Sequence, residues 1–155
     1  YGATLNVRGA DVDVAGTANV GNIGVAAISE FIPAASLAIP RGVAIDSAGN
    51  MYVANNNGSV SKATFSSPGV LGGVTTFIPT GSGLSQPGYM AFDGTGNLYI
   101  ANYGGNTISK VTFSSPGVLG TLSTFVDNTN GLSEPTGMET GLMAEVSTLN
   151  LASMP

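Results

Sequence analysis

The chain contains two near-copies of one segment. Residues 40–55 read Pro-Arg-Gly-Val-Ala-Ile-Asp-Ser-Ala-Gly-Asn-Met-Tyr-Val-Ala-Asn, and residues 87–102 read Pro-Gly-Tyr-Met-Ala-Phe-Asp-Gly-Thr-Gly-Asn-Leu-Tyr-Ile-Ala-Asn. The octapeptide Phe-Ser-Ser-Pro-Gly-Val-Leu-Gly then occurs unchanged at 65–72 and 113–120. The offset is 47 residues at the prolines (87 − 40) and 48 at the phenylalanines (113 − 65), so the second copy has one extra residue, most simply in the loop 103–106. Repeats of this length are typical of stacked supersecondary modules.

Each copy has the pattern of four short strands. Short apolar or alternating runs are separated by Gly, Asn and Pro, which favours strands over helices. The expected strands of the first copy are 42–46, 51–55, 59–65 and 74–78, and those of the second are 89–93, 98–102, 107–113 and 122–126. Runs such as 43–45, 51–54, 90–92 and 98–101 are apolar on both faces, which predicts sheets covered on both sides by neighbouring sheets.

The turn between the first two strands is also repeated. It reads Asp-Ser-Ala-Gly-Asn at 46–50 and Asp-Gly-Thr-Gly-Asn at 93–97. Gly and Asn tolerate the positive φ that a hairpin turn needs, and an Asp side chain accepts hydrogen bonds from turn amides. We therefore interpret six residues as structural turn residues, although a metal or general-base role is the alternative for the two aspartates: Asp46, Gly49, Asn50, Asp93, Gly96 and Asn97.

The composition excludes several function classes. Of the 155 residues 43% are hydrophobic but only 8% are charged, and the net charge is −5 with four basic residues. Nucleic acid and anionic membrane surfaces require clustered positive charge, which this chain lacks. No run approaches the ~20 apolar residues of a membrane span. The chain has no His and no Cys, which removes Ser-His-Asp, Cys-His and disulfide chemistry. Low charge with Gly/Asn/Ser-rich loops favours an extracellular or cell-surface protein.

The pattern divides the chain into three parts. Residues 1–28 alternate in short Gly-punctuated runs and are expected to form a degenerate blade or closing strands. Residues 29–138 carry the repeats, with Phe-Ile-Pro at 31–33 and 77–79 and Phe-Val-Asp at 125–127 in equivalent places. Residues 139–155 lack the repeat signature and are expected to be a divergent tail, for which one amphipathic helix is an alternative.

The repeated motif Pro-x-Gly-Val-Ala-Ile-Asp-x-x-Gly-Asn-x-Tyr-Val-Ala-Asn resembles a blade of NHL-repeat β-propellers, and Lys62 and Lys110 fall near a position that is often basic in such blades. The resemblance covers residues 29–138 and implies an all-β, propeller-like fold of four-stranded antiparallel blades. Closed propellers use ~4–8 blades, whereas the chain holds about 3.3 repeat lengths (155/47). We therefore expect an incomplete ring that belongs to a longer protein, is completed by oligomerisation, or stacks openly.

Four residues are candidates for ligand binding. Asn55, Asn102 and Tyr103 lie at the ends of the second strands, where loops are expected to leave one face of a propeller, and Arg41 departs from its partner Gly88. Amides and an aromatic ring suit a glycan or a peptide, although turn residues and a solvated loop charge are the alternatives. Mid-strand Tyr52 and Tyr99 are better explained by packing between blades than by ligand stacking.

These observations predict a non-catalytic module that binds protein or glycan or has a structural role, with no cofactor and no metal. A self-assembling surface or filament subunit is the first alternative, because an incomplete ring leaves edges that invite homo-oligomers. A fragment of a metal-dependent lactonase or hydrolase is the second. The resemblance implies that such enzymes use carboxylates with Asn, or a catalytic His, in a central channel. The absence of His argues against the lyase-like chemistry.

Overall fold

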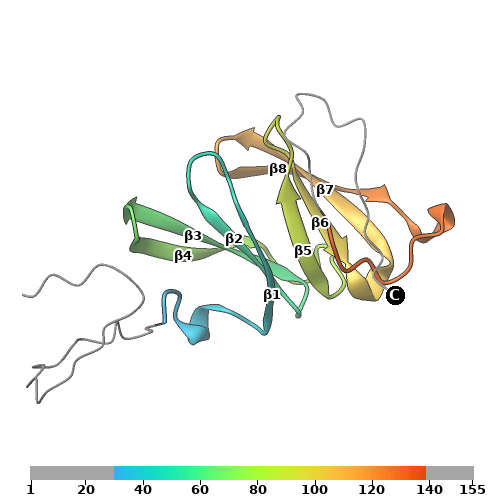
Figure 1. The fold of residues 1–155 in the computed structure, drawn as a ribbon, viewed down its shortest axis with the longest axis horizontal. Coiled ribbons are helices and arrows are strands. Elements are labelled where there is room, and N and C mark those ends of the chain that lie inside the picture. Colours follow the sequence, from blue (N-terminus) through green and yellow to red (C-terminus); the bar gives the residue numbers. More distant parts are fainter. Residues whose placement is uncertain (1–29, 139–155) are drawn as a thin grey trace, which may run out of the picture.

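The computed structural model describes residues 30–138, which form two four-stranded antiparallel sheets with the same strand order (Figure 1). We call the first sheet blade 1 and the second blade 2. Blade 1 comprises β1 (Pro40–Ile45), β2 (Met51–Asn55), β3 (Ser59–Ser67) and β4 (Val70–Ile78). Blade 2 comprises β5 (Pro87–Phe92), β6 (Leu98–Asn102), β7 (Thr107–Ser115) and β8 (Val118–Val126). The predicted all-β, propeller-like fold is confirmed, and the predictions for 1–28 and 139–155 lie outside the described residues.

Short 3₁₀ turns lie in three loops: η1 (Ala34–Ser36), η2 (Tyr103–Gly105) and η3 (Asn128–Asn130). The loop between β2 and β3 has three residues, 56–58, whereas the loop between β6 and β7 has four, 103–106. The extra residue of the second copy therefore lies where the repeat offset predicts it, and η2 occupies the enlarged loop.

The octapeptide forms the hairpin between the two outer strands of each blade. Its Pro-Gly dipeptide is the whole turn, because β3 ends at Ser67 and β4 begins at Val70. Pro fixes φ of the first turn residue, and Gly69 takes a positive φ of 77° at the second. The predicted outer strands, which left most of the octapeptide unassigned, were too short in both blades. Ser66 and Ser67 of the octapeptide lie in β3, so only Pro68 and Gly69 form the turn.

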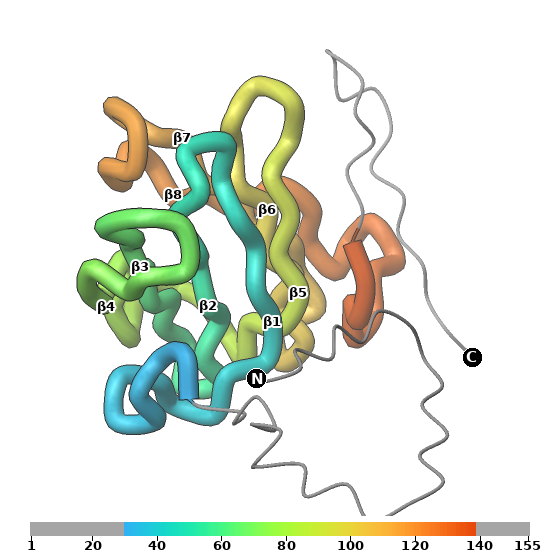
Figure 2. Tube along the Cα trace, turned by 60° about the vertical axis from the view of Figure 1, so that its left-hand side comes forward, coloured from blue at the N-terminus to red at the C-terminus, as the bar shows by residue number. Residues whose placement is uncertain are grey.

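The two blades meet at their first strands. Figure 2 shows β1 running beside β5, and an ideal Cβ at Gly42 would lie 1.8 Å from the carbonyl oxygen of Gly88. Only glycine at position 42 permits this approach. The main hydrophobic cluster spans both blades and includes Tyr52, Ile78, Met90 and other buried side chains: Ala44, Ala54, Val60, Phe77, Leu84, Leu98, Ile100 and Val111.

The expectation that the apolar strands are covered on both sides is confirmed for the second strand of each blade but is wrong for β1. Tyr52, Val53 and Ala54 of β2 are almost completely buried, as are all five residues of β6. In β1, Val43 is 53% exposed and Ile45 is 58% exposed, because blade 2 covers only the face that carries Gly42 and Ala44. In the described part of the chain, nothing comparable covers the other face.

Candidate functional site

Two hollows lie at opposite ends of the first strands. We call the hollow at the start of β1 and β5 the Arg41 pocket; its volume is about 250 Å³. The hollow at the far end of these strands is larger, about 550 Å³, and lies between the two blades; we call it the interblade groove. The Arg41 pocket is lined by Arg41, Gln86, Gly88, Tyr89, Tyr103, Pro135 and Thr136.

The Arg41 pocket is built where three loops meet. The backbone N–H of Tyr103 donates to the carbonyl of Gln86 at 3.3 Å, and that of Gly104 donates to the carbonyl of Ser85 at 3.2 Å. A Cβ at Gly104 would lie 2.9 Å from the Ser85 Oγ, so the two loops pack closely because that residue is glycine. These contacts hold the Tyr103 loop against the residues that lead into β5.

A left-handed residue directs the chain into this pocket. Gln86, which precedes Pro87, has a φ of 46°, and Ile39 and Glu134 have φ values of 54° and 43° before Pro40 and Pro135. Non-glycine residues adopt positive φ uncommonly, and for β-branched Ile the conformation is a genuine outlier. Because it recurs at the same position in every described unit, this bend belongs to the repeat itself.

The polar chemistry of the pocket comes from Arg41 and two tyrosines. Arg41 is exposed and makes no ion pair or hydrogen bond with another residue of the described range. Tyr89 is 49% exposed, and Tyr103 is partly buried. Gly88 stands where blade 1 has Arg41, and an ideal Cβ there would meet nothing within 4 Å. The absence of a side chain at Gly88 therefore leaves space beside the guanidinium of Arg41.

The two asparagines among the candidate residues lie elsewhere. Asn55 is 1% exposed; its Oδ1 accepts from the Ala38 N–H at 3.0 Å, and its Nδ2 donates to Ser59 and Ser61 at 3.1 and 3.0 Å. Asn102 is fully buried, and its Nδ2 donates to Thr107 and Ser109 at 3.1 and 2.9 Å. The structure thus brings Arg41 and Tyr103 into one pocket and places Asn55 and Asn102 inside the blades.

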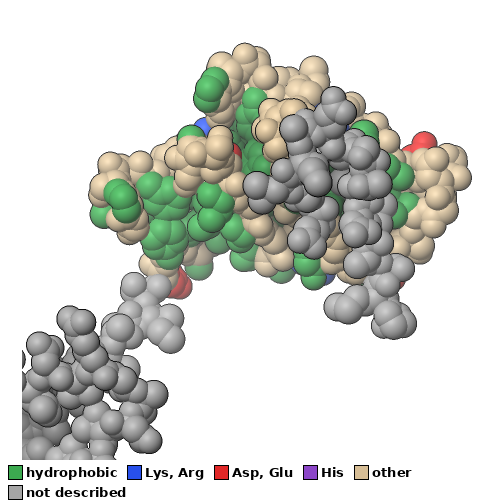
Figure 3. Space-filling model, turned by 45° about the horizontal axis from the view of Figure 1, so that its top comes forward, with side chains coloured by type: hydrophobic (Ala, Val, Ile, Leu, Met, Phe, Trp, Pro, Cys, Tyr) green, Lys and Arg blue, Asp and Glu red, His purple; other side chains and the backbone are tan. Residues whose placement is uncertain are grey.

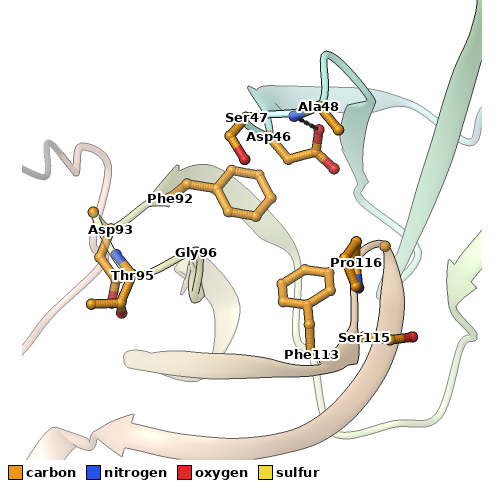
Figure 4. Close-up of a pocket in the computed structure, with 12 residues that line it drawn as sticks. Asp46, Ser47, Ala48, Phe92, Asp93, Thr95, Gly96, Phe113, Ser115 and Pro116 are labelled. Carbon is orange, nitrogen blue, oxygen red and sulfur yellow. Dashed lines mark hydrogen bonds between the residues drawn. The ribbon is translucent and has the colours of Figure 1, made fainter.

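The interblade groove has an aromatic floor and an acidic rim. Figure 4 shows the rings of Phe92 and Phe113 between the Asp46 and Asp93 turns, and the ring centroids are 5.9 Å apart. The hairpin residues Ser115, Pro116 and Gly117 form the remaining wall.

Both aspartates of the rim are engaged by their own turns. Asp46 accepts from the N–H of Ala48 at 3.0 Å and from the N–H and Nδ2 of Asn50, both at 2.8 Å. Asp93 makes the equivalent bonds to Thr95 and Asn97 at 2.8 to 2.9 Å. Gly49 and Gly96 both have a φ of 84°. These bonds occupy much of the acceptor capacity of each carboxylate.

Burial and hydrogen bonding shift the pKa of three groups. Desolvation raises the pKa of Asp93, but the bonds from Asn97 and Thr95 outweigh it, and the net pKa is lowered. The bonds from Thr129 likewise lower the pKa of the partly exposed Asp127. Burial, followed by the charge of Asp46 and the hydrogen bond to it, raises the pKa of Tyr52. The stability that Asp93 contributes is therefore present above its unfolded pKa and is lost as the pH falls through its lowered folded value.

Within residues 30–138, no group of three or more acidic, His or Cys side chains is close enough together to hold a metal ion. In the same range, no helix is long and apolar enough to cross a membrane.

Comparison with known proteins shows the fold. No protein-family model matches the chain, and no curated protein matches its sequence. The virginiamycin B lyase of Staphylococcus aureus superposes with a TM-score of 0.50 at 16% identity over 66% of this chain and 31% of that one. A streptogramin B lyase gives 0.50 at 20% identity over 66% and 30%. The chain thus spans less than a third of the length of either structure, and at this identity the likeness shows a β-propeller-like fold alone.

Sequence reasoning missed Gln86 and Tyr89 as pocket residues. A usable signal was present, because the two copies diverge at the start of their first strands: Arg41-Gly42 stands against Gly88-Tyr89. Residues that differ between the two copies do not take part in the packing that both copies share. Here the departure places a cation and an aromatic ring on neighbouring strands.

Proposed function

We propose that the chain is a non-catalytic, extracytoplasmic segment of an NHL-type β-propeller, and that its Arg41 pocket binds a carboxylate-bearing glycan. The observation that carries this proposal is the exposed guanidinium of Arg41, without a counter-ion among the described residues, beside two tyrosines in a pocket of about 250 Å³. A pocket of this size suits one sugar residue of a longer chain. The NHL assignment is supported by the repeated motif and by the strand order of both blades.

The guanidinium supplies the charge recognition. Its planar fork of N–H donors matches the two oxygens of a carboxylate, and a bidentate pair fixes orientation as well as adding energy. The chain carries a net charge of −5, so long-range attraction does not draw anions to it, and selectivity must come from local geometry. An acidic sugar seated on Arg41 satisfies that geometry.

The tyrosines and Gln86 supply contacts to a sugar ring. A tyrosine presents an apolar ring face together with a hydroxyl, and it loses little side-chain entropy on binding. Gln86 adds an amide that both donates and accepts hydrogen bonds. A glycan uses both kinds of contact, because its hydroxyls and its C–H face lie on the same ring. These contacts favour a uronate-type sugar over an acidic peptide.

The non-catalytic assignment rests on the chemistry of the side chains. The chain has no His or Cys to act as a base or nucleophile near neutral pH. The carboxylates of the interblade groove are held by their own turns. A metal-dependent hydrolase fragment is the weaker alternative, and a calcium titration tests it, because a metal that binds only the folded state must raise Tm.

The direct test is calorimetric titration with oligogalacturonate, with a neutral gluco-oligosaccharide and poly-glutamate as comparison ligands. We expect the wild type to bind oligogalacturonate, Arg41→Gln to lose at least tenfold in affinity, and Arg41→Lys to lose part of it. Gly88→Val should block the pocket, because its side chain enters space that is empty in the wild type. Thr80→Ala, on an exposed loop outside the pocket, is the matched control.

Three outcomes separate the components of the proposal. Binding of poly-glutamate but not of oligogalacturonate would replace the glycan by an acidic peptide. Binding that Gly88→Val and Arg41→Gln leave unchanged would remove the pocket from the function altogether. Turnover of any ligand that is lost on changing Asp46 or Asp93 would contradict the non-catalytic assignment.

A further inference from the structure

The interblade groove is large enough to hold a small organic molecule. Its volume of about 550 Å³ lies within the range of ~300–1,000 Å³ that is common for ligand sites in proteins. The residues that line it come from the β1–β2 turn, the β5–β6 turn and the β7–β8 hairpin. Figure 3 tilts this end of the molecule toward the viewer and shows hydrophobic side chains exposed among uncharged polar groups, with few charged ones. The groove therefore has the size of a binding site on a weakly charged surface.

The floor of the groove consists of two aromatic rings that the blade contact holds in place. Phe92 and Phe113 are both partly exposed, and both line the groove. The buried Tyr52 ring packs against them at 5.3 and 6.0 Å, and Phe77 stacks on Phe113 at 5.4 Å. Aromatic rings that are fixed from below and open to a groove attract cations, because the face of a π-system is negative.

The rim of the groove carries negative charge. Asp46 and Asp93 lie on facing turns of the two blades. In the part of the chain that the structure describes, the basic side chain at this groove is Lys62, whose ammonium donates to the Gly117 carbonyl at 2.9 Å. Two carboxylates and one ammonium give the groove a formal charge of −1 (−2 + 1), and the whole chain carries −5. Both the local and the long-range field therefore favour a cation.

The two carboxylates offer charge but little further capacity to accept hydrogen bonds. Asp46 accepts four hydrogen bonds, which come from its own turn and from the Tyr52 hydroxyl. Asp93 also accepts four, all from its own turn. An ionised carboxylate has about four lone-pair sites. A primary ammonium or a guanidinium seated here would lose its water without gaining a carboxylate acceptor, and leaving such donors unpaired is costly.

These constraints select one ligand chemistry. A quaternary ammonium group is cationic but has no N–H to satisfy, and its methyl groups pack against aromatic rings. A neutral apolar ligand would remove water from two carboxylates without supplying a compensating charge. A ligand with an anionic group beside its cation would be repelled by the rim.

We propose that the interblade groove binds a small soluble compound that carries a quaternary ammonium group with no anionic group beside it. The cation sits on Phe92 and Phe113, between the Asp46 and Asp93 turns. The groove lies at the opposite end of β1 and β5 from the Arg41 pocket, so this inference stands independently of the proposed function.

Three probes that share a hydroxyethyl tail test the chemistry. Choline has a trimethylammonium head, ethanolamine has a primary ammonium, and 3,3-dimethyl-1-butanol has a neutral tert-butyl head with the shape of that of choline. NMR titration of the isotope-labelled full chain measures each Kd. We expect choline to bind about tenfold more tightly than either of the others. The proposal is overturned if choline does not bind, or if the amine or the alcohol binds as tightly as choline.

The repeat supplies a matched control for the aromatic floor. Phe113→Leu keeps an apolar side chain but removes the π face, so the affinity for choline should fall about fivefold, the equivalent of one cation–π interaction. Phe65→Leu changes the equivalent residue in the identical octapeptide of blade 1, outside the groove, and should bind choline as the wild type does. Phe92→Leu repeats the test if Phe113→Leu does not fold. Equal affinities of the Phe65 and Phe113 variants would remove the groove from binding.

The two described lysines test the charge of the groove. Lys62→Met changes the formal charge of the groove from −1 to −2, so choline should bind more tightly. Lys110→Met changes the equivalent residue of blade 2, which lies over the Tyr99 ring, and should leave the affinity unchanged. A general loss of structure does not increase affinity, so the direction of the change is diagnostic. Binding that is insensitive to salt, or weaker in Lys62→Met than in Lys110→Met, would contradict electrostatic recognition.

A further pair of probes identifies the source of the ligand, because some lipid head groups also carry a quaternary ammonium. In phosphocholine a phosphate lies close to the same trimethylammonium head, so the acidic rim should make it bind more weakly than choline. Phosphatidylcholine vesicles should not co-sediment with the chain. Tighter binding of phosphocholine than of choline, or co-sedimentation that free choline competes away, would contradict a soluble ligand without an anionic group.

Discussion

Blades 1 and 2 have nearly the same sequence and the same strand order but different surroundings. In blade 1, Tyr52 is surrounded by three aromatic rings, two of them from blade 2. In blade 2, its equivalent Tyr99 contacts one ring, Phe125 of its own blade. The residues that the repeat retains are therefore of two kinds: those that form a blade and those that join one blade to the next.

The difference also shows what a single blade lacks. The turn between the first two strands is held by the same Asp–Asn hydrogen bonds in both blades, so each copy encodes this local structure itself. Phe77 of blade 1 is covered at the blade contact and 9% exposed, whereas its equivalent Phe125 in blade 2 is 46% exposed. Most of the hydrophobic stabilisation of such a unit comes from stacking, and a lone unit cannot bury its apolar face.

The largest effect is expected when Tyr52 is truncated. Tyr52→Ala should lower the free energy of unfolding by about 4 kcal/mol, because it removes a fully buried aromatic side chain. Tyr99→Ala should cost about 2 kcal/mol less, because it breaks one ring pair instead of three and each pair contributes ~0.5–1.5 kcal/mol. Urea unfolding of both variants, at concentrations where the chain is monomeric, measures the difference. Equal losses would mean that the blade contact adds little to stability.

A second comparison uses two glycines on adjacent first strands. Gly42→Ala should destabilise the chain by about 3 kcal/mol, because the new methyl group overlaps the Gly88 carbonyl and forces the blades apart. Gly88→Ala should be neutral or stabilising by up to about 1 kcal/mol, because its Cβ meets nothing and the unfolded chain loses entropy. Thermal unfolding distinguishes the two. A harmless Gly42→Ala would show that the strands are not held this closely.

Much of the fold could be predicted from the sequence because both copies of the repeat carry the same local patterns. The four strands of each blade, the Asp-x-x-Gly-Asn turn and the loop that holds the extra residue all follow from local patterns that recur in register. The ends of the outer strands could not be predicted in this way. Ser-Ser-Pro-Gly has the composition of a loop, although only Pro68 and Gly69 form the turn. The identity of the octapeptide in both copies indicated a shared structural role, but no local rule converts identity into strand length.

The Arg41 pocket could be predicted only in part. Arg41 and Tyr103 stand out because they interrupt the repeat, but their proximity depends on how the loops of blades 1 and 2 meet. Asn55 and Asn102 have the same side chain at the same strand end, and only tertiary structure shows that both are buried. A polar residue at a strand end can face a loop or the sheet interior, and the sequence pattern is the same for both.

The two lysines give a smaller effect. Lys62→Met should cost about 2 kcal/mol, because a charged hydrogen bond to the Gly117 carbonyl is lost across the blade contact. Lys110→Met should cost about 0.5 kcal/mol, because only the interaction with the Tyr99 ring is removed. Both are measured by urea unfolding of the monomer. A larger loss of unfolding free energy for Lys110→Met than for Lys62→Met would contradict this difference between the blades.

The smallest effect is a pH dependence that only blade 1 should show. The Tyr52 hydroxyl donates to Asp46 at 3.2 Å, and in the described residues no such bond joins Tyr99 to Asp93. Because burial and Asp46 raise the pKa of folded Tyr52 above its ordinary value of 10.0, the unfolded state ionises first as the pH rises. The stability that Tyr52 contributes is thus intact below pH 10 and falls above it, by up to ~1.4 kcal/mol per pH unit.

Tyr52→Phe should therefore flatten the alkaline arm of the stability profile, by about 1 kcal/mol at pH 11. Denaturant unfolding between pH 8 and 11 measures this arm, and Tyr89→Phe, whose side chain is half exposed, is the control. A profile for Tyr52→Phe that falls as steeply as the wild type would place the alkaline sensitivity on other groups. A flattened profile for Tyr52→Phe but not for Tyr99→Phe would instead trace it to the one tyrosine that meets both its own turn and the next blade.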